Sequence, residues 1–185
     1  MNWAKVVVVV ILAGLITLNG CKKDNDATPS CTKEVEASKL TTPDQTKLTS
    51  DSLLIVQYLA DNGITGTEIL NKVRYKIHEL GTGETPCLQN TIKLHYKGRL
   101  MKTGYVFDPD QETQPDVNWQ EREASFTLSS LIVGWQVVLP TIPAGTKLTL
   151  YIPSGYGYGT GVGGGGAIPV NANLIFDIEF LEIVK

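Results

Sequence analysis

Six aromatic residues and one carboxylate are the side chains of this sequence best suited to form a binding site. The chemistry open to such a set is to bury and orient an apolar group. The aromatic residues fall on the predicted inward faces of strands or beside a short apolar segment: Tyr96, Phe107, Phe126, Trp135, Tyr158 and Phe176. Aromatic residues most often form only a core. Here, however, Asp108 directly follows Phe107, and a carboxylate beside a buried aromatic cluster needs a partner, which weighs towards a pocket.

A glycine-rich run, IPSGYGYGTGVGGGGAIP at residues 152–169, can be read as a linker, a phosphate-binding loop or a pocket wall. Gly159, Gly161 and Gly164 match a G-x-G-x-x-G pattern, but a dinucleotide-binding loop must open a helix whose N-terminal amides bind the phosphates. Pro169 and a predicted strand follow instead, which argues against nucleotide binding. Strands flank the run on both sides, which argues against a linker. The run is therefore predicted to be a mobile loop at the mouth of a pocket.

Other chemistry finds little support in the sequence. The two histidines, His78 and His95, fall on the polar faces of predicted strands, and no His, Cys or acidic cluster has metal-ligand spacing. We therefore expect no metal and no cofactor. The sequence has no Gly-x-Ser-x-Gly motif, and its net charge of -3 argues against nucleic acid as a partner.

The hydrophobic pattern predicts the elements that position these side chains. Apolar and polar residues alternate in four segments, and two shorter strands complete the set. The predicted strands are residues 72–80, 91–100, 104–108, 124–128, 146–153 and 171–185. Residues 129–140 form a short, largely apolar helix that Pro140 ends. The sum is an α+β domain over residues 68–185, an antiparallel sheet with one buried face covered by a single short helix.

A further short helix is predicted within residues 50–67. Ser50 or Asp51 can cap its N-terminus, and Asn62-Gly63 ends it. Its predicted apolar stripe consists of Leu54, Ile55, Tyr58 and Leu59.

The N-terminal residues 1–20 resemble a bacterial lipoprotein signal. A short positive region is followed by an apolar run that ends in the letters LNGC, and Cys21 would be the lipidated residue. An uncleaved anchor or a buried strand is the alternative. Lys22 follows in place of an aspartate, which favours the outer membrane, and residues 21–49 read as a solvated tether. Cys31 and Cys87 then remain, either as a disulfide in an oxidising compartment or as two free thiols.

The order of motifs in residues 72–185 resembles an FKBP-type peptidyl-prolyl cis-trans isomerase. The matching stretches are LHYKGRLMKTGYVFD, FTLSSLIVGWQVVLPTIPAGTKLTLYIPSGYGYG and AIPVNANLIFDIEFLEI. The resemblance implies a bent antiparallel sheet wrapped around one short helix, with an apolar pocket between them. It implies catalytic roles for Tyr96, Asp108, Trp135 and Tyr158. It implies substrate binding by Phe107, Phe126, Leu131, Ile132, Ile168 and Phe176.

The function implied by the resemblance is cis-trans isomerisation of X-Pro bonds in exported proteins by a membrane-anchored folding helper. Its partners would be proline-containing polypeptides, macrolide ligands of the family would fit the same pocket, and the chain would be a monomer. Asp108 is expected to orient the pocket by hydrogen bonding with Tyr96 or another neighbour. The alternative is a non-catalytic module that holds proline-containing segments as a chaperone or surface adhesin.

Overall fold

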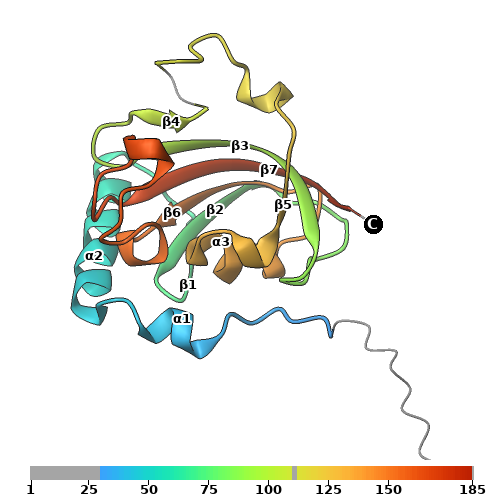
Figure 1. Cartoon of the computed structure of the whole chain (residues 1–185), viewed down its shortest axis with the longest axis horizontal. Coiled ribbons are helices and arrows are strands. Elements are labelled where there is room, and N and C mark those ends of the chain that lie inside the picture. Colours follow the sequence, from blue (N-terminus) through green and yellow to red (C-terminus); the bar gives the residue numbers. More distant parts are fainter. Residues whose placement is uncertain (1–29, 110–111, 185) are drawn as a thin grey trace, which may run out of the picture. The chain divides into compact units, whose positions relative to one another are not determined.

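The computed structural model describes residues 30–109 and 112–184, which contain a seven-stranded, fully antiparallel sheet (Figure 1). The sheet order is β1-β2-β6-β7-β3-β4, and β5 also pairs with β3. The strands are β1 (Glu68–Leu70), β2 (Val73–Glu79), β3 (Thr91–Leu100), β4 (Val106–Asp108), β5 (Ala124–Thr127), β6 (Lys147–Ile152) and β7 (Leu174–Val184). The two longest strands, β3 and β7, pair along their whole length at the centre.

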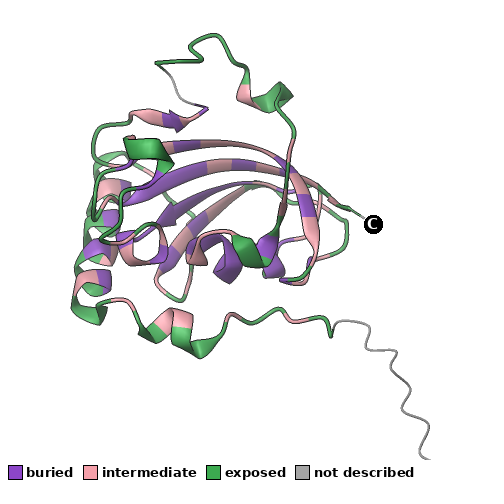
Figure 2. Ribbon diagram, viewed as in Figure 1, coloured by how far each residue is buried: buried purple, intermediate pink, exposed green. Residues whose placement is uncertain are grey.

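The short helix α3 (Val133–Val138) lies in the concave side of the bent sheet (Figure 1). Buried residues concentrate on the central strands and on α3 (Figure 2), and Trp135, Phe176 and Phe180 are among the large side chains of this core. The predicted α+β class, with an antiparallel sheet around a short helix, is confirmed. The helix is shorter than predicted because residues 128–130 form a separate 3₁₀ turn, η2 (Leu128–Ser130).

The N-terminal helix differs from its prediction. Helix α2 spans Gln45–Asp61 and begins five residues before the predicted start, because the Asp44 carboxylate caps it by accepting from the backbone N–H groups of Thr46 and Lys47. The two predicted caps, Ser50 and Asp51, instead lie within the helix, and Asp51 is fully buried. A further short helix, α1 (Ala37–Thr41), lies in the stretch expected to be tether.

The apolar stripe of α2 also differs from its prediction. Its buried residues are Leu48, Asp51, Ile55 and Leu59, whereas Leu54 is 53% exposed. Ile55 and Leu59 pack with Tyr151 of β6 and Ile175 of β7 in a second apolar cluster. Part of the sheet face expected to be solvated is therefore covered by α2, and both faces of β6 are buried there.

Residues 31–61, here called the N-terminal strap, are attached to the domain by a disulfide between Cys31 and Cys87. The backbone N–H of Leu88 donates to the carbonyl of Thr32 at 2.7 Å beside it. The structure thus decides the open question of the two cysteines in favour of the disulfide. In the described part of the chain, no helix combines the length and the apolar character that crossing a membrane requires. The predicted signal and Cys21 lie outside the described residues.

Candidate functional site

Five of the six predicted aromatic residues form a connected cluster of rings around Trp135. The indole of Trp135 on α3 lies edge-on to Phe176 of β7 at 5.1 Å between ring centroids and to Tyr96 of β3 at 5.6 Å. Phe107 of β4 contacts Phe176 at 5.7 Å, and Phe126 of β5 contacts Tyr96 at 6.0 Å. Edge-to-face geometry is the favoured arrangement of aromatic pairs. Four strands and the helix thus each supply one ring to the same place.

A glycine of β3 permits this close packing. A Cβ atom on Gly98 would lie 2.6 Å from the ring of Phe107 and 2.7 Å from the ring of Phe176. Any side chain at this position would therefore displace the rings. The glycine of the HYKG motif is needed here for space.

The polar edge of the cluster consists of a tyrosine, a carboxylate and an arginine. The Tyr96 hydroxyl donates to Asp108 Oδ2, and Arg122 Nη1 lies 2.9 Å from Asp108 Oδ1. The hydrogen bond that the sequence led us to expect between Tyr96 and Asp108 is present. Arg122 was missed by the sequence analysis, because it lies in the long loop between β4 and β5, where no pattern ties a basic residue to the site.

The protonation of the two phenols of the site follows from these surroundings. Burial, and then the hydrogen bond to Asp108, raises the pKa of Tyr96 above its ordinary value. Tyr158 is 40% exposed, and its partial burial, with a smaller contribution from the Asp108 charge, also raises its pKa. Because both shifts are upwards from a value of 10.0, both phenols remain protonated hydrogen-bond donors at neutral pH.

Tyr158 lies in the glycine-rich run, and the glycines shape its position. A Cβ on Gly163 would lie 2.6 Å from the Tyr158 ring, so the ring packs directly over this glycine. Gly163 and Ile168 exchange two backbone hydrogen bonds of 3.2 Å each, and Ile168 is buried. Four glycines of the run adopt positive φ, a conformation that side chains rarely allow: Gly159, Gly164, Gly165 and Gly166. The run is therefore a hydrogen-bonded loop whose glycines are required by its turns, while the predicted mobility stays a prediction.

The rim of the site provides donors without protein partners. Leu131 and Ile132 are half-buried and pack against the main core. Within the described residues, the backbone N–H of Ile132 donates to no protein acceptor, and the buried Nε1 of Trp135 also has no partner. A backbone N–H without a partner is a strong donor for a ligand carbonyl. The two groups lie three residues apart at the start of α3.

A groove of about 550 Å³ extends the site towards the strap. Its lining includes Tyr158 and Val133 together with strap residues, among them Lys39 of α1, Pro43 between the two helices and Lys47 of α2. The described residues include no group of three His, Cys, Asp or Glu side chains placed to hold a metal ion.

The comparisons agree with the motif order of the sequence. The family model described as FKBP-type peptidyl-prolyl cis-trans isomerase matches residues 83–181. The chain is 35% identical over 133 residues to the FKBP-type isomerase FkpA of Aeromonas hydrophila. The aligned residues make up 70% of this chain and 45% of that protein. It is 32% identical to the FKBP-type 22 kDa isomerase of Escherichia coli, over 69% of this chain and 59% of that protein. The chain thus spans about half the length of the curated relatives it matches.

Solved structures show the same fold. A peptidyl-prolyl cis-trans isomerase of Pseudomonas syringae superposes with a TM-score of 0.58 at 26% identity, covering 77% of this chain and 97% of the other. FkpA of Escherichia coli superposes with a TM-score of 0.56 at 30% identity, covering 75% and 63%. Fold, motif order and family model coincide over the same residues. The chain therefore belongs to the FKBP-type peptidyl-prolyl cis-trans isomerase family.

Proposed function

We propose that this chain is a peptidyl-prolyl cis-trans isomerase that accelerates X-Pro exchange in exported proteins. One observation carries the proposal: the ring cluster around Trp135 is intact and is bordered by hydrogen-bond donors that have no protein partner. An apolar surface of this kind suits a proline ring, and the free N–H of Ile132 suits a neighbouring carbonyl.

The reaction needs no nucleophile. Rotation about the peptide bond has a barrier of about 18–20 kcal/mol, and unaided X-Pro exchange takes tens to hundreds of seconds. The planar imide owes its double-bond character to charge separation, which water stabilises and which the twisted transition state loses. A site that takes the imide out of water therefore favours the twisted state, and each 1.4 kcal/mol of this preference gives about a tenfold rate increase.

The site residues divide this task. Trp135 forms the floor on which the proline ring packs, with Phe176 and Phe107 behind it and Phe126 at the edge. The Tyr158 hydroxyl holds a substrate carbonyl while the bond rotates. Asp108 acts by holding Tyr96, and Arg122 balances its charge, so neither group transfers a proton.

We further propose that the protein works in the bacterial cell envelope, held at the outer membrane by a lipid on Cys21. Two observations support this location. The Cys31–Cys87 disulfide is typical of exported proteins, and one relative, 33% identical over 61% of this chain, is named outer membrane protein MIP in Legionella longbeachae. Its clients would be proline-containing segments of exported polypeptides, and macrolide ligands of the family would compete for the same site.

The test is an exchange assay on a short X-Pro peptide by nuclear magnetic resonance, comparing wild type, Tyr158→Phe and Trp135→Ala. We expect Tyr158→Phe to lower kcat/KM about two- to tenfold, the value of one hydrogen bond. Trp135→Ala should lower it further and also cost about 3–5 kcal/mol of unfolding free energy. A wild type that binds the peptide without accelerating exchange would instead support the non-catalytic binding module.

A further inference from the structure

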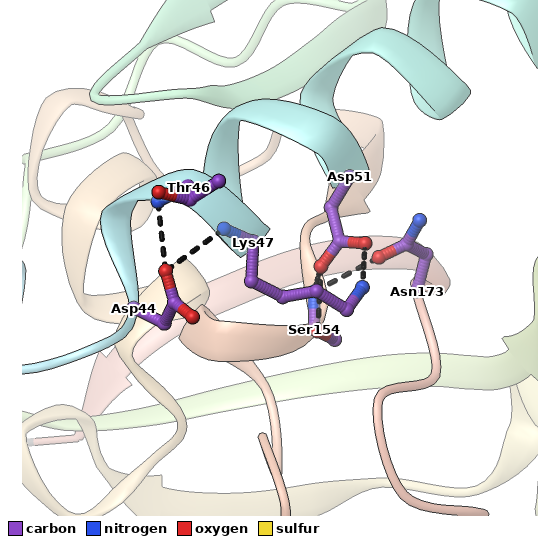
Figure 3. Close-up of polar contacts among 6 residues, drawn as sticks. All are labelled: Asp44, Thr46, Lys47, Asp51, Ser154 and Asn173. Carbon is purple, nitrogen blue, oxygen red and sulfur yellow. Dashed lines mark hydrogen bonds and ion pairs between the residues drawn. The ribbon is translucent and has the colours of Figure 1, made fainter.

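A buried carboxylate of the strap is directed at the loop that carries Tyr158. Asp51 of α2 is fully buried, and its Oδ2 accepts hydrogen bonds from the backbone N–H of Ser154 at 3.1 Å and from the Ser154 hydroxyl at 2.5 Å (Figure 3). Its other oxygen pairs with Lys47, one helical turn earlier. Buried carboxylates are costly unless they are paired and hydrogen-bonded, and this one is both.

Ser154 joins this carboxylate to Tyr158. It opens the 3₁₀ turn η4 (Ser154–Tyr156), which directly precedes the loop. Its carbonyl accepts from the N–H of Gly157 at 3.0 Å and from the N–H of Gly159 at 2.8 Å, the residues on either side of Tyr158. Asp51 thus holds the amide and hydroxyl of the residue whose carbonyl holds both neighbours of Tyr158.

Two further contacts fix the same turn. Asn173 Oδ1 accepts from the N–H of Ser154 at 2.9 Å (Figure 3), and the Tyr156 hydroxyl donates to the carbonyl of Leu40 at 3.2 Å. A Cβ on Gly155 would lie 3.0 Å from the side chain of the fully buried Leu48 of α2. The turn is therefore packed against the strap over three consecutive residues.

We propose that Asp51 is a positioning residue for isomerisation, which holds Tyr158 at the site through Ser154. The inference rests on the proposed function, and it extends the site to a helix outside residues 83–181, which the family model matches. Asp51 touches no substrate. Its hydrogen bonds with Ser154 fix the position of the turn relative to α2, because hydrogen bonds weaken steeply when their distance or angle changes. Without it, Tyr158 would leave the position in which its hydroxyl meets the substrate carbonyl.

The test compares Asp51→Asn and Ser154→Ala with a control on the same helix. Ile55 is equally buried one turn later but packs against Tyr151 and Ile175, away from the turn. The control is either Ile55→Val or Ile55→Ala, whichever lowers the melting temperature by an amount closer to that of Asp51→Asn. We expect Asp51→Asn to lower kcat/KM severalfold, by no more than the two- to tenfold of Tyr158→Phe, and Ser154→Ala to have a smaller effect. The Ile55 control should keep the wild-type kcat/KM.

A second readout does not depend on catalysis. The ring resonance of Tyr158, assigned by its loss in Tyr158→Phe, should shift in Asp51→Asn and Ser154→Ala but not in the Ile55 control. If the resonance and kcat/KM stay unchanged in Asp51→Asn, or change equally in the control, the positioning role is wrong. If the wild type is inactive while the Tyr158 resonance still shifts in Asp51→Asn, the proposed function is wrong, but the conclusion that Asp51 positions Tyr158 is retained.

Discussion

The aromatic site and the N-terminal strap both depend on apolar packing, but they differ in the directional links that are added to it. The site depends mainly on ring packing, with ring centroids 5.1–6.4 Å apart around Trp135 and Tyr96. The strap packs through Leu48, Ile55 and Leu59 and adds directional links. These links are the disulfide, the hydrogen bond from Lys39 Nζ to Gln136 Oε1 at 3.1 Å, and the hydrogen bonds that Asp51 accepts from Ser154. Apolar packing is non-directional, whereas hydrogen bonds fix distance and angle.

This difference suggests that the two regions have different roles. Under the proposed function, the rings would provide a surface for the substrate, and the strap would determine the positions of the surrounding loops. Gln136 illustrates the second task, because its Nε2 donates to the carbonyls of Ser129 and Leu131, and its Oε1 accepts from Lys39 of the strap. The strap thus meets the rim at Leu131 as well as the turn before Tyr158.

The largest expected effect is a loss of unfolding free energy on removal of the disulfide, without a loss of catalytic activity. The disulfide closes a loop with a sequence separation of 56 residues, so replacing both cysteines by serine should lower the unfolding free energy by about 4 kcal/mol. Because the hydrogen bonds from Ser154 to Asp51 and from Lys39 to Gln136 do not involve the cysteines, kcat/KM of the folded variant should stay at the wild-type value. Urea denaturation and the exchange assay measure the two quantities. A parallel fall in kcat/KM would show that these hydrogen bonds do not position the site unless the disulfide is also present.

A smaller effect is expected from adding one methyl group under Tyr158. Gly163 has a negative φ of -105°, so alanine fits its backbone, but the new Cβ would meet the Tyr158 ring. Gly163→Ala should therefore displace the ring and lower kcat/KM about two- to tenfold, as the loss of the hydroxyl does. Val162→Ala, next to it and 66% exposed, is the matched control. Equal activity of the two variants would contradict the packing of Tyr158 over Gly163.

The sequence predicted the ring cluster because Tyr96 and Phe176 lie in strands with a clear period of two and because the other members lie in motifs of fixed order. The fold class and a single helix covering the sheet followed from the patterns, whereas the hydrogen bond between Asp108 and Tyr96 or another neighbour was a hypothesis drawn after the family resemblance. Local patterns did not predict Arg122 or Asp51, whose partners lie 14 and 103 residues away along the chain. An aspartate within a helix reads as a cap or a solvated residue, and only the tertiary structure shows that Asp51 is buried against Ser154.

The most direct test of the account is a double-mutant cycle on kcat/KM between Asp51→Asn and Tyr158→Phe. If Asp51 acts through the Tyr158 hydroxyl, its replacement should cost severalfold in the wild type and little in a protein that already lacks the hydroxyl. The coupling should then be close to the whole effect of Asp51→Asn. Independent, multiplicative losses in the double variant would contradict the claim that the strap positions the catalytic tyrosine.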